Sequence, residues 1–218
     1  IVAPKPKPSR EKRPRSFSVT EDGIWLRNPY AIYAKKILEL EPLDPIDQMP
    51  SPADRGDFIH QILETVVSAG IPENHEEAVA LLIEKGREIF DRALEKPIVW
   101  AFWWPRFKRI AEWFVRHEAE ERENLLASYT EKRGVWEFVL KERPMQLRAT
   151  ADRIDRMKHD KWSIIDYKTG AIPSKRDVEG GLAPQLPLEA LILAKGGFKD
   201  LPAIECGQLQ YYHLTGGI

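Results

Sequence analysis

Two aspartates and a lysine lie at spacings that suit metal-assisted chemistry. In the segment KWSIIDYKTG, alternation along a strand puts Asp166 and Lys168 on one face. The preceding segment QLRATADRIDRM carries Asp152, and the polar stretch KHDK between them predicts a hairpin turn. Because residues paired across a hairpin have a constant number sum, a turn centred near His159 brings Asp152 opposite Asp166 or one residue away. Like charges facing each other across strands are destabilising, so this arrangement needs a cation, and an oxygen-binding divalent metal supplies one.

A purely structural interpretation of the same residues is a set of surface ion pairs. Asp166 would pair with Lys168 at the end of an edge strand, and Asp152 would pair with Arg153 or Arg156. A bare Asp-x-Lys is common in proteins. The context favours chemistry, because an apolar strand runs directly into Asp-Tyr-Lys-Thr-Gly and the strand before it carries Ala-Asp-Arg-Ile-Asp.

Strands and one helix are predicted in the part of the chain that carries these residues. After Gly134 the apolar residues alternate, which predicts strands in VWEFVL, QLRATADRIDRM and KWSIIDY. A helix is expected from about Pro184 to Lys195, and ECGQLQYYHL indicates a further strand. This order indicates an α/β core, residues 134–218, with an antiparallel hairpin.

The part before it, residues 17–133, has helical spacing. Ser51 and Asp54 can cap a helix that starts at Pro52 and ends at Gly70. Two more helices are expected near Glu76 to Leu94 and Pro105 to Leu126, with the stretch VWAFWWPRF between them. Its tryptophans could stack on single-stranded bases, but packing between helices is the more common role of such clusters; they are Trp100, Trp103 and Trp104.

Composition limits the remaining classes of function. The 218 residues include 33 Lys+Arg and 34 Asp+Glu, so any polyanion site must be a local patch. Residues 1–16 alternate prolines with basic residues, which favours an extended interdomain linker whose charge either solubilises it or touches DNA. No apolar run is long enough to span a membrane. The single cysteine, Cys206, cannot form an intrachain disulfide, and a cytoplasmic location is expected.

Four motifs together resemble a known family. ADRGDFIHQILE, TADRIDR, IIDYKTG and APQLPLEALIL resemble the successive motifs of the RecB-like nucleases, within the PD-(D/E)XK superfamily. The segment SVTEDGIWLRNPYAIYAKKILELEPLDP resembles the start of the C-terminal nuclease domain of AddB-type helicase–nuclease subunits. The resemblance implies a restriction-endonuclease-like α/β fold over residues 17–218, with a mixed sheet, flanking helices and an N-terminal helical subdomain.

The resemblance also implies an activity, a cofactor and partners. The activity is a Mg²⁺-dependent DNA exonuclease, with Mn²⁺ able to substitute, that processes double-strand breaks. The DNA would be a single strand fed from a helicase, and the protein partner an AddA-type helicase–nuclease subunit. Lys168 matches the catalytic lysine and Gln185 the motif glutamine, while Asp166 serves both catalysis and the metal. The implied metal ligands are the side chains of His60, Asp152 and Asp166 and the backbone carbonyl of Tyr167.

Two positions depart from the family pattern. The family commonly has an aromatic residue four positions after the motif glutamine, where this chain has Glu189, which weakens a DNA-contact role there. Many AddB relatives hold an iron–sulfur cluster with four cysteines, and Asn28 stands where one of them would be. We therefore expect no iron–sulfur cluster.

Two other functions keep the same fold. An inactive scaffold that grips DNA or a partner subunit is disfavoured because the polar motif residues are present. A stand-alone RecB-like exonuclease is disfavoured by the missing initiator Met and the basic, proline-rich start.

The single cysteine generates a first prediction. The purified chain should show no visible iron–sulfur absorbance, and thiol-blocking reagents should leave its activity intact, because Cys206 alone cannot hold a cluster. Absorption spectroscopy and iron analysis check this. A brown protein with stoichiometric iron would contradict it.

Overall fold

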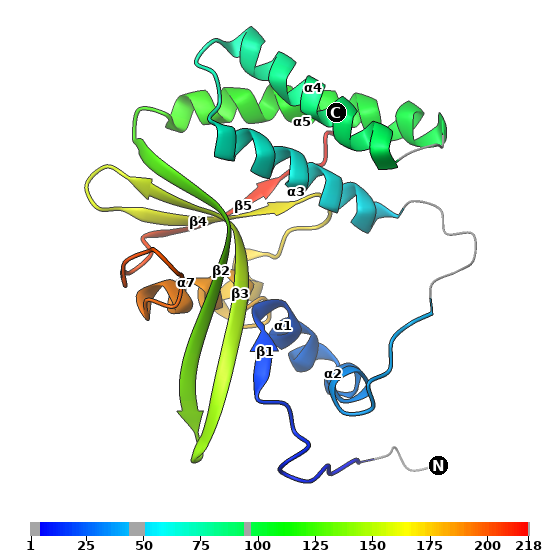
Figure 1. Ribbon diagram of the computed structural model, residues 1–218, viewed down its shortest axis with the longest axis vertical. Helices are drawn as coiled ribbons and strands as arrows, with labels where there is room; N and C mark the ends of the chain where they lie inside the picture. The colour runs from blue at the N-terminus through cyan, green and yellow to red at the C-terminus, as the bar shows by residue number, and fades with distance from the viewer. Residues whose placement is uncertain (1–4, 44–50, 94–96, 218) are drawn as a thin grey trace.

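The computed structural model describes residues 5–43, 51–93 and 97–217. Figure 1 shows a bent sheet with a layer of helices on each side. The strands are β1 (Ser16–Ser18), β2 (Leu125–Leu140), β3 (Arg143–Met157), β4 (Trp162–Lys168) and β5 (Gln208–His213). The helices are α1 (Val19–Arg27), α2 (Pro29–Lys36), α3 (Pro52–Ala69), α4 (His75–Ala93), α5 (Pro97–Glu121), α6 (Lys175–Glu179) and α7 (Gln185–Ala194).

The long strand β3 organises the five-stranded sheet. Strand β2 pairs with it antiparallel from Leu140↔Arg143 to Leu125↔Met157, so β2 occupies one edge of β3 along its whole length. The other edge pairs with β1 in parallel over 146–148 and with β4 antiparallel over 153–156. Strand β5 then pairs with β4 in parallel. The predicted α/β class, mixed sheet and antiparallel hairpin are therefore confirmed. Along this second edge of β3, residues 149–152 separate the stretch paired with β1 from the stretch paired with β4.

Two apolar clusters cover the two faces of this sheet. Ile165 and Tyr167 of β4 belong to the cluster formed with α3, α4 and α5. Trp162 and Ile164 alternate with them and belong to the cluster formed with α7. The helix α3 begins as predicted, because Ser51 and Asp54 form a capping box before Pro52. None of the helices in the described ranges is long and apolar enough to cross a membrane.

The helix α5 differs from the prediction of a helix that starts at Pro105. It begins at Pro97 and carries Pro105 in its interior. The aromatic side chains explain why the helix continues, since Trp104 is buried and its ring lies 5.9 Å from Phe90 and 5.6 Å from Phe107. Packing of this kind offsets the lost backbone hydrogen bond of an internal proline. The expected packing role of the tryptophan cluster therefore holds for Trp104.

The helical part also ends earlier than expected. The strand β2 starts at Leu125, before the switch predicted at Gly134, and joins β3 through a two-residue turn in which Lys141 and Glu142 both have positive φ. The short elements β1 and α6 were not predicted. The described part of the basic segment before β1, residues 5–15, is mostly exposed and contacts this turn: Arg10 Nη2 donates to the carbonyl of Lys141 at 2.9 Å.

A buried charged triad ties the helical layer to the sheet. Arg153 of β3 is 1% exposed and donates two hydrogen bonds to the carboxylate of Glu118 of α5, at 2.6 and 3.0 Å. It also donates to Asp155 at 2.7 Å. Charges this far from water are stable only when paired, so the triad fixes the position of α5 against β3.

Removing one member of this triad should unfold the chain more easily. We expect Glu118→Ala to lower the free energy of unfolding by about 3–5 kcal/mol, because Arg153 stays buried with half of its partners lost. Urea denaturation followed by circular dichroism measures this. The matched control, Glu120→Ala, changes an exposed glutamate of the same helix and should cost less than about 0.5 kcal/mol. Equal losses in the two variants would refute the structural role.

Candidate active site

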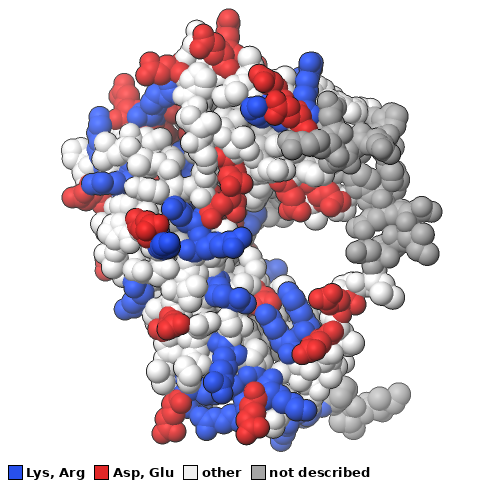
Figure 2. All heavy atoms as spheres, in the orientation of Figure 1, with Lys and Arg blue, Asp and Glu red and all other residues white. Residues whose placement is uncertain are grey.

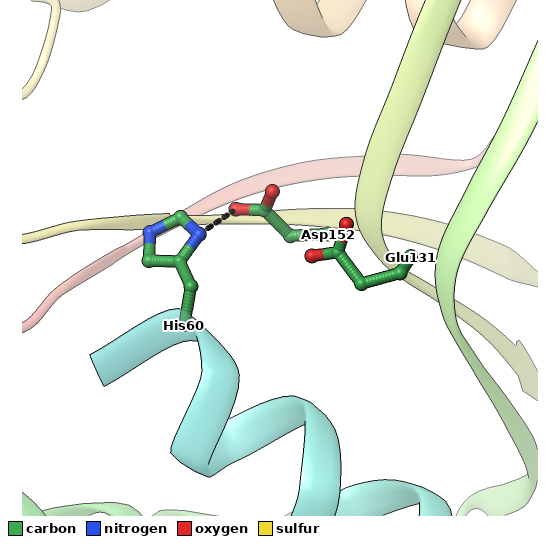
Figure 3. Close-up of side chains that lie close together, drawn as sticks. All are labelled: His60, Glu131 and Asp152. Carbon is green, nitrogen blue, oxygen red and sulfur yellow. Dashed lines mark ion pairs between the residues drawn. The ribbon is translucent and has the colours of Figure 1, made fainter. Parts of the chain in front are cut away.

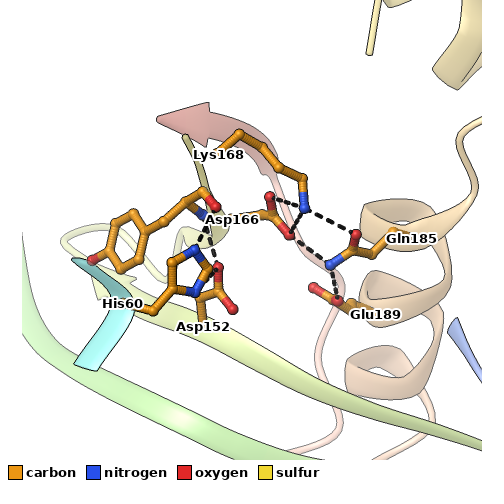
Figure 4. A network of polar contacts seen from close by, with 7 residues as sticks. His60, Asp152, Asp166, Lys168, Gln185 and Glu189 are labelled. Atoms are coloured by element: carbon orange, nitrogen blue, oxygen red, sulfur yellow. Dashed lines mark hydrogen bonds and ion pairs between the residues drawn. The ribbon is translucent and has the colours of Figure 1, made fainter. Parts of the chain in front are cut away.

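The six predicted site residues come together at the end of β4. His60 comes from α3 and Asp152 from β3, while α7 begins with Gln185. The other three, Asp166, Tyr167 and Lys168, are consecutive residues of β4. Figure 4 shows their side chains between α3 and α7, with His60 and Asp152 on one side of Asp166 and Gln185 on the other. The site thus joins both helical layers through the sheet.

The β3–β4 pairing brings Asp152 to Asp166. The last paired residues of the two strands are Arg153↔Ile165, and one further step in the same register leads to Asp152 and Asp166. Oδ2 of Asp152 accepts a hydrogen bond of 2.8 Å from the backbone N–H of Tyr167. The carboxylate of Asp152 therefore bonds to the backbone of β4 just beyond the last paired residues.

His60 bridges the helical layer to both strands. Its Nε2 lies 2.7 Å from the carbonyl oxygen of Tyr167, and its Nδ1 lies 3.5 Å from Oδ2 of Asp152. The helix is held there by Arg55, which donates to the carbonyl of Thr169 at 3.1 Å. Burial lowers the pKa of His60, but the hydrogen bond and charge of Asp152 outweigh it and the net pKa is raised. A metal ion binds the deprotonated imidazole, so protons and metal compete at His60.

Asp166 is the buried centre of the other half of the site. It is 2% exposed, and Nζ of Lys168 lies 2.8 Å from its Oδ1 and 2.7 Å from its Oδ2. Gln185 donates to Oδ1 at 2.5 Å and accepts from Nζ of Lys168 at 3.2 Å. Burial raises the pKa of Asp166 to about 6, with Lys168 opposing the shift and Asp152 adding to it. Lys168 is thus held between a carboxylate and an amide oxygen.

The Asp166–Lys168 ion pair of the purely structural interpretation is present, but the geometry contradicts the rest of that interpretation. Asp166 is buried on a strand with partners on both sides, so it does not lie on an edge. Asp152 does not pair with the arginines beside it, because Arg153 binds Glu118 and Arg156 lies 3.9 Å from Asp160.

Glu189 belongs to this site. The sequence had indicated only that a glutamate stands where the family commonly has an aromatic residue. It is 1% exposed, and its Oε1 accepts a 3.2 Å hydrogen bond from Gln185 one helical turn earlier. Its Oε2 is buried without a hydrogen-bond partner. Burial first, and then the charge of Asp166, raise the pKa of Glu189 to about 8. The neutral acid is therefore the form that suits this position at neutral pH.

Glu131 of β2 is a further candidate ligand that was missed. Ligand atoms of His60, Glu131 and Asp152 all lie within 4.8 Å of one another, and Figure 3 shows the three side chains together. The constant number sum of the β2–β3 hairpin, read from Leu140↔Arg143, places Glu131 opposite Asp152 and would have found it. Burial and then the charge of Asp152 raise the pKa of Glu131. An imidazole nitrogen with several carboxylate oxygens is a donor set that fits Mg²⁺ or Mn²⁺.

A mixed sheet with a histidine, two aspartates and a lysine gathered at the end of one strand is typical of metal-dependent nucleases. Comparison with known proteins agrees. The family model of the PD-(D/E)XK nuclease superfamily matches residues 16–217, and the chain belongs to this superfamily. An uncharacterized protein of Rickettsia typhi is 33% identical over 92% of the chain, and one of Rickettsia bellii is 33% identical over 85%. The chain spans 24% and 22% of the length of these two relatives.

The raised pKa of Glu189 gives the fold a pH dependence. Between about pH 4.5 and 8 the folded chain keeps a proton on Glu189 that the unfolded chain has lost, so the free energy of unfolding falls as the pH rises. Glu189→Gln cannot lose a proton and should remove this contribution, which amounts to about 1.4 kcal/mol per pH unit at most. Urea unfolding with EDTA at pH 5 to 8 measures the difference. The control Glu179→Gln, at an exposed position, should follow the wild type. Parallel curves for all three proteins would contradict the assignment.

Proposed function

We propose that this chain is a Mg²⁺-dependent deoxyribonuclease domain that degrades DNA from an end, during helicase-coupled processing of double-strand breaks in the cytoplasm. The observation that carries the proposal is the convergence of His60, Asp152 and Asp166 with Lys168 beside them. An AddA-type helicase–nuclease subunit is the proposed partner. The relatives carry this region within much longer chains, which supports a domain that works with other parts.

In this proposal the ligands hold the metal and the lysine acts on the phosphate. His60, Asp152, Asp166 and the carbonyl of Tyr167 would hold the ion, as the family resemblance implies. Glu131 would be a further ligand, because its carboxylate clusters with His60 and Asp152, a cluster that does not include Asp166. A bound divalent cation lowers the pKa of water and stabilises charge on a phosphate oxygen.

Side chains that do not bind the metal would act on the phosphate. Lys168 offers a positive charge to the phosphoryl oxygens, where negative charge develops as the phosphodiester bond breaks. Gln185 orients Lys168, since it bonds to both Lys168 and Asp166. The protonated form of Glu189 adds no negative charge next to the incoming phosphate.

Asp166 and Lys168 should fail in different ways when they are replaced. Asp166→Asn removes a charged ligand, so both Mn²⁺ affinity and DNA cleavage should fall. Lys168→Ala should lower cleavage at least about 100-fold and leave Mn²⁺ affinity unchanged or tighter, because a competing positive charge is gone. His60→Ala should resemble the aspartate variant. Calorimetric titration of Mn²⁺ and Mg²⁺-dependent digestion of end-labelled single-stranded DNA measure the two properties.

A matched variant separates these effects from a general loss of positive charge. Lys158→Ala, at an exposed position in the β3–β4 turn, should cleave and bind Mn²⁺ like the wild type. Wild-type cleavage by Lys168→Ala would overturn the mechanism. Unchanged Mn²⁺ affinity in Asp166→Asn would overturn the metal site.

A further inference from the structure

A groove of about 840 Å³ lies away from the candidate active site, against the tip of the β2–β3 hairpin. Its walls come from three places: the basic segment before β1, the helices α1 and α2, and the hairpin turn. None of the candidate site residues lines it. Its volume falls within the range of ligand-binding pockets.

Positive charge surrounds this groove. The cationic side chains that line it are those of Arg10, Arg13, Lys141 and Arg143, and the acidic residue among its lining is Glu142. Within the described ranges, none of the four cations forms an ion pair with a carboxylate. Figure 2 shows Lys and Arg gathered over the lower part of this face, where the hairpin and the N-terminal segment lie.

The arginines are held close together by backbone contacts. Arg143 donates to the carbonyl of Arg13 at 2.7 Å, and Arg10 donates to the carbonyl of Lys141 at 2.9 Å. Partial desolvation, and then the charges of Arg15, Arg10 and Arg13, lower the pKa of Arg143. These cations repel one another where they stand, so a polyanion would relieve that repulsion.

An aromatic ring lies within this positive surface. Trp25 of α1 lines the groove and remains 45% exposed. Its ring stacks on the buried Phe17, with centroids 4.7 Å apart and an angle of 22° between the planes. Stacking on a fixed ring holds Trp25 in place while part of it stays open to solvent. Trp104 differs, because it is buried in the helical layer.

We propose that this groove binds single-stranded DNA, with arginines on the phosphates and Trp25 stacked on a base. A positive groove combined with aromatic rings is the recognition chemistry of unpaired nucleic acid. An acidic peptide would need the charge but gain little from an exposed tryptophan. The identity of the polymer as DNA rests on the nuclease function proposed above.

The groove lies at a distance that lets one strand occupy both sites. From Arg143 to Asp152 the strand β3 covers at most roughly 30 Å, at about 3.3 Å per residue. A stacked strand rises about 3.4 Å per nucleotide, so roughly nine nucleotides cover this length. A 30-nucleotide probe is therefore long enough to contact both sites.

The first test removes the stacking ring without changing charge. Binding of fluorescent (dT)30 is measured by anisotropy in EDTA, so that no cleavage occurs. Trp25→Leu should bind at least about fivefold more weakly, with an unchanged salt dependence, and Trp25→Tyr should restore binding. The control Trp113→Leu replaces another partly exposed helical tryptophan and should bind like the wild type. An abasic 30-mer should not distinguish Trp25→Leu from the wild type.

The second test removes charge without changing the ring. The double variant Arg10→Ala with Arg13→Ala should lower the slope of log K against log salt concentration by about 1.4, the value for two phosphate contacts on a single strand. Lys158→Ala with Lys161→Ala removes the same charge at the far end of β3 and should leave the slope unchanged. Circular dichroism checks that each variant folds, and Arg143→Gln provides a milder change of the same groove.

The outcomes separate this site from the nuclease proposal. Binding that is equal in groove and control variants would overturn the groove site, even if the chain cleaves DNA. Tighter competition by poly-glutamate than by (dT)30 would assign the groove to an acidic protein and also overturn it. Groove-dependent binding by a chain that cleaves no DNA would instead overturn the nuclease proposal.

Discussion

Two aspartates, Asp152 and Asp166, lie side by side on paired strands with little water around them. The side chain of Asp152 is 14% exposed and that of Asp166 is 2% exposed, so solvent screens their repulsion poorly. Each carboxylate has its own compensation: Asp152 accepts from a backbone N–H and lies near His60, while Asp166 contacts Lys168 and Gln185. The rest of the fold positions α3, α7 and β4 around these two carboxylates.

The negative charge of these carboxylates is only partly compensated, which favours the binding of a cation. The pKa of Asp166 is raised to about 6 and that of Glu189 to about 8, while Glu131 is also shifted upward. Burial is the first cause of each shift and neighbouring carboxylates add to it, so the charged forms are disfavoured relative to the same groups in water. A divalent cation would reverse these shifts, since it stabilises the charged forms at once. Proton release on metal binding is therefore built into the arrangement.

Local patterns were sufficient to predict the hairpin and the helix that carries His60. The KHDK turn fixes which residues of β3 and β4 face each other, and Ser51 with Asp54 fixes the start of α3. Contacts between distant segments were not predictable in this way. The burial of Glu189 depends on α7 packing over β4, and the passage of α5 through Pro105 depends on aromatic packing with α4. Glu131 was within reach of the hairpin arithmetic, but only once β2 is known to begin before Gly134.

Charge is distributed unevenly over a chain whose net formal charge is only −1. Some cations of the helices are neutralised nearby: Lys85 lies 3.0 Å from Glu88, and Lys36 lies 3.0 Å from Glu21. Around the hairpin tip the arginines have backbone carbonyls as partners, which neutralise no charge. A local positive potential therefore persists there although the sum is close to zero. The strand β3 runs from this positive surface to Asp152, so one continuous element joins the hairpin tip to the candidate active site.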